Sequence, residues 1–214
     1  METKNKLLSK RKLIAILVIV IAAIFLICGA FAVLPALFED EVEPYSEPPR
    51  ANYNFYDPDY DENIFEDEEY LLLIKNGIFE YDDGAFISMV DKNNAYEHGP
   101  SLELVVDMLY SVINGNAKEY NSYFSDRYFE TREPKDKFTM QKIYDGRITF
   151  FALEVKSENG KEYTEYTYKL KYRILENNGT FRDDIGDGYG VQHVTITDRD
   201  GELKIESINH VIYK

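Results

Sequence analysis

The longest apolar pattern in the chain is a run without charge from Leu13 to Phe38, which covers 26 positions. A helix of that length spans roughly 39 Å, which exceeds the hydrocarbon layer of a bilayer, about 30 Å thick. Five basic residues precede the run, and four acidic residues follow it closely. This asymmetry predicts a cytoplasmic tail at 1–12, a transmembrane helix at 13–38 that binds the lipid bilayer, and an extracytoplasmic remainder.

A cleaved signal peptide is the alternative for this run. Ala30, Phe31 and Ala32 satisfy the small-x-small rule for cleavage, so the chain would be secreted after a cut near Ala32. The apolar run continues beyond that point to Phe38, however, whereas a cleavage site ordinarily ends it. We therefore favour an uncleaved single-pass anchor in the cell membrane, and both interpretations place residues 39–214 outside the cytoplasm.

Residues 39–69 show neither helical nor strand periodicity and are rich in acidic residues, Pro and Tyr, which predicts an extended spacer. Part of this segment, 57–68, approximates a calcium-binding loop. Its oxygen-bearing positions are Asp57, Asp59, Asp61, Asn63 and Glu68. The template requires Gly at its sixth position, where Glu62 stands, so a solvated acidic spacer is favoured over a metal site.

Residues 70–99 are expected to form a lead-in to the folded domain. Apolar stretches at 71–74 and 78–81 flank Asn76 and Gly77, which predicts a tight hairpin. A short helix over 68–75 is the alternative, because four consecutive apolar residues there show no period of two.

Two helices are predicted next. Pro100 and Ser101 open the first, with Ser101 as N-cap. Its apolar stripe recurs at helical spacing: Leu102, Val105, Val106, Leu109, Val112 and Ile113. Gly115 ends it, and Asn116 with Glu119 forms a capping box for a second, short helix. Residues 138–143 are expected to add one more helical turn.

The period then changes to two, which predicts strands at 147–156, 165–174, 191–197 and 202–213. The alternation slips near Phe151, which indicates a bulge, and Asn159-Gly160 indicates a hairpin turn. Together these elements predict an α+β domain at 100–214, with helices packed on a curved antiparallel sheet of about four to six strands.

The composition of the chain argues against several classes of function and site. The chain has 39 acidic and 24 basic residues and a net charge of -15, which argues against binding nucleic acid. Thirteen acidic residues against Arg50 alone lie within 39–69, so the acidity is concentrated in the predicted spacer. A single Cys excludes an internal disulfide and Cys-based zinc sites, and no pattern indicates a cofactor or another metal. Abundant Tyr, Asn, Lys and Ile without Trp hint at an AT-rich bacterial genome.

From residue 100 onward the chain shows a helix followed by Gly115-Asn116, a short helix ending in Tyr123-Phe124-Ser125, and a meander that closes on residues 200–208. This order of elements resembles the nuclear transport factor two-like superfamily. The resemblance implies a curved sheet wrapped around helices. The superfamily includes enzymes, small-ligand binders and membrane-anchored scaffold modules, so the fold alone does not choose among these functions.

Candidate chemistry is sparse. His98, His193 and His210 show no spacing that joins them to a carboxylate in a known motif. Tyr166, Tyr168, Tyr172 and Phe150 either line a ligand pocket or pack beneath the helices, and packing is favoured. The opposite row of Lys169, Lys171 and Arg173 is interpreted as a solvated strand face.

These observations predict a membrane-anchored, non-catalytic protein-interaction module with a partner in a cell-envelope assembly. The alternative is a domain that binds a small ligand or a wall fragment in an aromatic-lined pocket. An enzyme that uses a buried acid or base is the third and least favoured hypothesis.

Overall fold

The computed structural model describes residues 54–210. The predicted cytoplasmic tail 1–12, the predicted membrane helix 13–38, the first part of the acidic spacer and residues 211–214 lie outside the described residues. Within 54–210, no helix is both long enough and apolar enough to cross a bilayer. The anchor therefore stays a prediction from the sequence.

One long helix and several short ones make up the helical part. They are η1 (Ile64–Glu66), α2 (Glu68–Leu71), η2 (Ala95–His98), α3 (Pro100–Ile113), α4 (Ala117–Ser122) and α5 (Asp126–Phe129). The predicted stripe of α3 is buried, as its helical spacing requires. Asn116 is confirmed as the N-cap of α4, because its Oδ1 accepts from the Glu119 backbone N–H at 3.0 Å. The full capping box is not formed, since Glu119 Oε2 accepts from Asn116 Nδ2 at 2.9 Å while the Asn116 backbone N–H donates to the carbonyl of Ser111.

Two helix predictions are wrong in detail. Gly99, with φ at 94°, is the N-cap of α3, so Ser101 lies inside the first turn. Its hydroxyl is buried and hydrogen-bonds the Tyr168 hydroxyl at 2.8 Å instead of capping the helix. The helical turn expected at 138–143 is absent. The backbone of these residues instead hydrogen-bonds to a neighbouring segment, where the Gln141 backbone N–H donates to the carbonyl of Ile113.

Six strands form one sheet. They are β1 (Ile78–Asp82), β2 (Ala85–Val90), β3 (Lys142–Glu158), β4 (Lys161–Leu175), β5 (Tyr189–Thr197) and β6 (Lys204–His210), in the order β2-β1-β3-β4-β5-β6. The sheet is mixed, because β1 runs parallel to β3 while all other neighbours are antiparallel. The prediction of a wholly antiparallel sheet is therefore wrong. Helices α3 to α5 return the chain to the starting end of β1 before β3 begins, and such a connection permits parallel pairing.

The lead-in segment contains both a helix and a hairpin, but not where the hairpin was expected. Residues 68–71 form α2, in agreement with the helical alternative. The hairpin joins β1 and β2 through Asp83 and Gly84, whose φ angles of 43° and 81° suit a tight turn. Asn76-Gly77 instead precedes β1, so the hairpin predicted there is wrong.

The predictions for β3 and β4 are confirmed. The pairing between them shifts between Phe150 and Ala152, at the expected bulge. Asn159 and Gly160 have φ angles of 52° and 78° and form the expected turn. Inward positions of β4 alternate with outward ones, and Tyr168, Leu170, Tyr172 and Ile174 are all buried.

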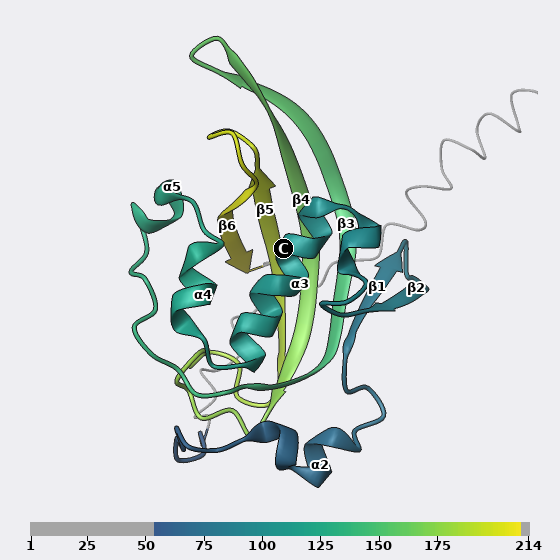
Figure 1. Ribbon diagram of the computed structural model, residues 1–214, viewed down its shortest axis with the longest axis vertical. Coiled ribbons are helices and arrows are strands. Elements are labelled where there is room, and N and C mark those ends of the chain that lie inside the picture. Colours follow the sequence, from purple (N-terminus) through teal and green to yellow (C-terminus); the bar gives the residue numbers. More distant parts are fainter. Residues whose placement is uncertain (1–53, 211–214) are drawn as a thin grey trace, which may run out of the picture. The chain divides into compact units, whose positions relative to one another are not determined.

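The helices cover the concave face of the curved sheet, as Figure 1 shows for α3 in front of β4 and β5. The core lies between these two layers, where α3 side chains meet the inward residues of β4 and β5. The α+β class is confirmed. The layered arrangement leaves an opening beside α4 and α5 that the next section describes.

The last part of the predicted spacer belongs to this fold. Ile64 is completely buried, and the carboxylates of Glu62 and Asp67 bind the ammonium group of the buried Lys142 at 2.8 and 2.6 Å. The spacer was expected to reach residue 69 because acidic residues dominate its composition. The structure corrects that boundary, since one apolar side chain and one buried base attach residues 62–69 to the sheet.

Candidate functional site

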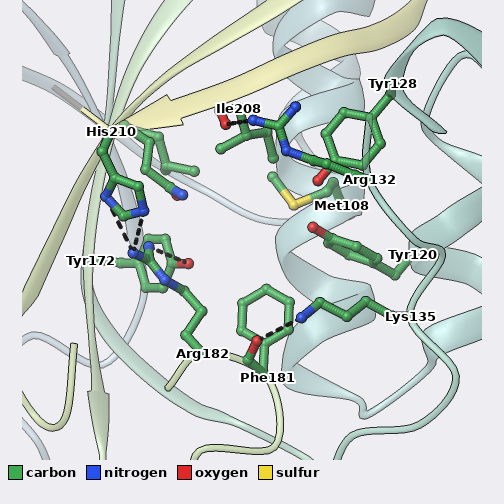
Figure 2. A pocket seen from close by; sticks show the side chains of 12 residues that line it. Met108, Tyr120, Tyr128, Arg132, Lys135, Tyr172, Phe181, Arg182, Ile208 and His210 are labelled. Carbon is green, nitrogen blue, oxygen red and sulfur yellow. Dashed lines mark hydrogen bonds between the residues drawn. The ribbon is translucent and has the colours of Figure 1, made fainter. Parts of the chain in front are cut away.

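A cavity of about 200 Å³ opens between the concave face of the sheet and the segment that runs from α4 to β3. Figure 2 shows its aromatic and basic side chains pointing toward one another across this space. The aromatic walls come from Tyr120, Tyr128, Tyr172 and Phe181. Its basic groups are Arg132, Lys135, Arg182 and His210, while no Asp or Glu among residues 54–210 belongs to the lining.

The aromatic wall is a continuous ring cluster. Tyr120 contacts Phe181 and Phe138 edge-on, with ring centroids 5.5 and 5.9 Å apart. Phe124 stacks at a tilt on Tyr128, with centroids 4.1 Å apart, and extends the cluster from α4 to α5. Rings packed in this way lock each other's rotamers, so the wall is formed before any ligand arrives.

Arg182 is the buried base of the site, with 8% of its surface exposed. Its Nε and Nη2 donate to the two carboxylate oxygens of Asp184 at 2.9 and 2.7 Å, and its Nη1 donates to the Tyr172 hydroxyl at 3.2 Å. Burial alone would lower the pKa of Arg182, but Tyr172 and Asp184 outweigh that effect and raise it. The guanidinium is therefore permanently charged and largely matched by Asp184.

The loop that carries Arg182 is organised by Asn177, a fully buried residue just after β4. Its side-chain amide donates to the carbonyls of Arg182 and Gly186 at 2.9 and 2.8 Å. The backbone N–H of Asn177 in turn donates to Asp187 Oδ1 at 2.8 Å. The Gly-rich loop of residues 177–190 thus holds Arg182 in a fixed position.

Gly190 makes room for the guanidinium. It lies opposite Tyr172 in the pairing of β4 with β5. A Cβ atom added there would lie 2.4 Å from Arg182 Nη1 and 3.1 Å from its Cζ. The absence of a side chain at this position therefore permits Arg182 to lie against the strand.

The phenol groups of the cavity are neutral at physiological pH. Burial raises the pKa of Tyr120, Tyr128 and Tyr172 above the ordinary value. His210 lies at the cavity edge, with its Nε2 3.2 Å from Arg182 Nη2 and 3.0 Å from Asp184 Oδ2. Burial, followed by the charge of Arg182, lowers the pKa of His210, so its imidazole is neutral at pH 7.

The four aromatic residues selected from the sequence lie in different environments in the structure. Tyr172 lines the cavity, while Tyr168 is buried under the start of α3. Phe150 is 47% exposed and contacts Tyr168 edge-on, and Tyr166 packs partly buried against the core. In the opposite row, Lys171 and Arg173 lie over the ring of Tyr189.

Most cavity residues were not identified from the sequence. Arg132, Lys135 and Arg182 come from segments without periodicity, so no pattern singles them out. Gln192 did carry a signal: it has the same strand phase as the buried Val194 and Ile196, which is unusual for a polar residue. His210 was considered only as an isolated histidine, because the contact with Arg182 depends on the fold.

The acidic residues of 57–68 do not assemble as the calcium template requires. Asn63 caps η1, and Asp59 accepts a hydrogen bond from the Asp61 amide. Among residues 54–210, the three acidic side chains close enough to share a cation are Glu62, Asp67 and Glu176. The ammonium group of Lys142 already binds all three.

The other two histidines lie away from the cavity. His98 Nδ1 is 2.6 Å from Glu80 Oε2, and its Nε2 is 3.5 Å from Ser88 Oγ. His193 packs on Phe151, with ring centroids 4.8 Å apart. Burial, followed by the charge of Lys169, lowers the pKa of His193.

Comparison with known proteins adds no relative: no protein-family model, no curated protein and no solved structure matches this chain.

Proposed function

We propose that the described domain binds a small ligand in the cavity between its sheet and helices, without catalysing a reaction. The supporting observation is the cavity itself. Its aromatic wall is packed in advance, it holds about 200 Å³, and its lining contains no carboxylate from the described part of the chain to act as acid or base. Small-molecule sites are typically concave, mostly apolar and supplied with a few fixed polar groups.

Its size suits a compact molecule. An engineered apolar cavity of about 150 Å³ takes up benzene, so this cavity suits a benzene-sized ring with one substituent. Drug-sized ligands usually need about 300 Å³ or more. The proposed ligand class is therefore a single small ring or an equally compact branched group.

Saturation-transfer NMR on the full chain in mild detergent tests this function with benzyl alcohol, benzamide, benzoate and phenyl phosphate. At least one probe should bind saturably. The variant Ile208→Phe, which fills the cavity from β6, should abolish that binding. Val191→Phe is the matched control on the outward side of β5 and should preserve it. Failure of all four probes to bind, or undiminished binding to Ile208→Phe, would contradict the proposal.

The non-catalytic part of the proposal has its own test. Three side chains lie in the spatial order nucleophile, base and carboxylate: Ser88, His98 and Glu80. The distance of 3.5 Å between Ser88 Oγ and His98 Nε2 is, however, at the limit of a hydrogen bond. None of the three lines the cavity. We expect no covalent labelling of Ser88 by a fluorophosphonate. Labelling that disappears in Ser88→Ala would identify an acyl-transfer enzyme instead.

A protein-binding role is the second candidate, and strand β2 favours it. This strand forms one edge of the sheet, carries no charge and exposes Phe86, Ile87 and Met89 by half or more. Exposed apolar edge strands are able to pair with a strand of another protein. A photo-crosslinker at position 87 should capture an envelope protein in native membranes if this surface is used, and Phe86→Lys should prevent the capture.

For location, we propose a single-pass membrane protein with the described domain on the extracytoplasmic side. The support is the uncharged run at 13–38 between a basic and an acidic flank. A ligand bound by the cavity would then come from the cell envelope or the surroundings.

A further inference from the structure

We propose that the cavity selects a small oxyanion, a carboxylate or phosphate attached to one compact ring, and that Arg132, Lys135 and Gln192 bind its oxygens. This inference rests on the proposed function and specifies its ligand class. Three observations carry it: the sign of the charge in the cavity, the unmatched N–H groups of the two bases, and the amide of a largely buried glutamine that lines the cavity.

The charge of the cavity is opposite to that of the protein. Three permanently charged bases line it without a carboxylate, although the chain as a whole has a net charge of -15. A concave site lined by one sign of charge between low-dielectric walls concentrates ligands of the opposite sign. An anion is therefore attracted to this cavity even though most of the molecule repels it.

Arg182 does not supply the main attraction, because Asp184 matches its charge from outside the lining. Arg132 and Lys135 differ from Arg182 in their hydrogen-bond partners. Their hydrogen-bond partners are neutral acceptors: Arg132 Nη2 donates to the carbonyl of Ile208 at 3.1 Å, and Lys135 Nζ donates to the carbonyl of Phe181 at 3.0 Å. Within residues 54–210, neither base lies within ion-pair distance of a carboxylate.

Aromatic rings hold both bases in place. The guanidinium of Arg132 lies 4.9 Å from the Tyr128 ring centre, and the ammonium of Lys135 lies 5.6 Å from that of Phe181. Figure 2 shows the two bases on the same side of the cavity, facing Arg182 and His210. A base fixed against a ring keeps its remaining N–H groups available, so an oxyanion meets donors that are already oriented.

Gln192 supplies an independent observation. It lines the cavity from β5 and is 93% buried, since only 7% of its surface is exposed. Its side-chain amide has no hydrogen-bond partner among the described residues. Unlike Glu80 Oε2 and Arg173 Nε, its amide atoms are not fully enclosed by protein, so they face the cavity and are open to water or to a ligand. An oxyanion that accepts from Gln192 Nε2 would replace water there.

The aromatic wall selects what the anion is attached to. The side chains of Tyr120, Tyr128 and Met108 border the same space as the two bases. A ring on the ligand would pack against them at ordinary aromatic and sulfur–aromatic distances. An inorganic anion lacks this contact, so phosphate alone should bind more weakly than phenyl phosphate.

Isothermal titration calorimetry on the full chain in mild detergent tests the inference with benzoate and benzamide, which have nearly the same shape but differ in charge. Phenyl phosphate and inorganic phosphate form the second pair. Benzoate should bind roughly 10-fold or more tightly than benzamide, because hydrogen bonds to charged groups are worth about 1.5–3 kcal/mol. The preferred anion of the two ring-bearing probes identifies carboxylate or phosphate as the natural group.

Variants locate the anion within the cavity. Lys135→Met and Arg132→Met should each weaken benzoate binding roughly 10-fold and leave benzamide binding within about twofold. Gln192→Leu should weaken benzoate binding, because it removes an amide donor from the cavity. Lys161→Met, at the far end of the β3–β4 hairpin, is the control for removal of one surface charge and should change neither affinity.

The outcomes separate the inference from the proposed function. Equal binding of benzoate and benzamide, both lost in Ile208→Phe, would overturn the oxyanion inference and leave small-ligand binding intact. Benzoate binding that persists unchanged in both Lys135→Met and Arg132→Met would also overturn it. Failure of every ring-bearing probe to bind would instead contradict the proposed function itself.

Discussion

Gly190→Ala tests whether the position of Arg182 depends on the missing side chain at residue 190. The added Cβ would lie 2.4 Å from Arg182 Nη1, far inside the range of normal contacts, so the guanidinium must move. That movement breaks the 3.2 Å hydrogen bond to Tyr172, whose side chain is 2% exposed and would lose its partner. The backbone itself does not require glycine, because Gly190 is not among the residues with positive φ.

The magnitude follows from these contacts. A hydrogen bond to a charged group contributes about 1.5–3 kcal/mol, while a Gly→Ala change in a permissive backbone stabilises by about 0.4–1 kcal/mol. The net loss is therefore about 1–2 kcal/mol. For a domain of this size each kcal/mol lowers the melting temperature by about 2–4 °C, so we expect a decrease of roughly 2–8 °C.

The assay is thermal unfolding followed by near-ultraviolet circular dichroism of tyrosine, which suits a chain with 18 Tyr and no Trp. The control is the same substitution in an Arg182→Met background. There the steric conflict with the guanidinium is gone, so Gly190→Ala should be neutral or slightly stabilising. An equal loss in both backgrounds, or no loss in the otherwise native chain, would refute the reasoning.

Three further predictions concern stability and topology. Lys142→Met should destabilise the domain by about 1–3 kcal/mol, because it leaves Glu62, Asp67 and Glu176 crowded without their ammonium partner; urea unfolding measures this, and an unchanged midpoint would contradict it. Burial acts to raise the pKa of Asp184, but the hydrogen bond and charge of Arg182 outweigh it, and the hydrogen bond from Lys142 lowers that of Asp67. The stabilisation that these two carboxylates contribute is therefore complete above their ordinary pKa of 3.8 and is lost as pH falls through the lowered pKa values. Melting temperatures measured from pH 6 to pH 2.5 should fall mainly below pH 4. A domain that stays equally stable below pH 4 would contradict this prediction. Protease added to intact cells should digest the domain if 13–38 is a membrane anchor, and protection of the domain until the cells are lysed would exclude an extracytoplasmic location.

Local signals in the sequence account for the elements that were predicted correctly. The stripe of α3, the N-cap of α4 at Asn116 and the turn at Asn159-Gly160 each depend on residues a few positions apart. The strict alternation in β4 likewise predicts which side chains are buried. Such features are encoded within one element and need no knowledge of its neighbours.

The features that were missed depend on contacts between distant segments. The parallel pairing of β1 with β3 joins residues nearly 70 positions apart, and no local pattern encodes it. The attachment of residues 62–69 depends on Lys142, which lies in the segment expected to form a helical turn and meets its carboxylate partners only in the folded structure. A spacer was predicted there from composition, which counts the charged residues of a segment but does not show which side chains form ion pairs with them.

The candidate site was the least predictable part for the same reason. Of the aromatic residues selected from β3 and β4, only Tyr172 lines the cavity, because helix α3 covers Tyr168. Arg132, Lys135 and Arg182 come from loops, where side-chain direction has no period. Gln192 is the exception, since its inward phase on β5 follows from the alternation alone.

The most direct test of oxyanion binding is the NMR signal of the Gln192 side-chain amide, assigned by its disappearance in Gln192→Leu. During a titration of the full chain with benzoate, this pair of NH₂ resonances should shift progressively and saturate, while an equal titration with benzamide moves them far less. Gln192 resonances that stay unmoved at saturating benzoate, or that respond equally to both compounds, would contradict the account.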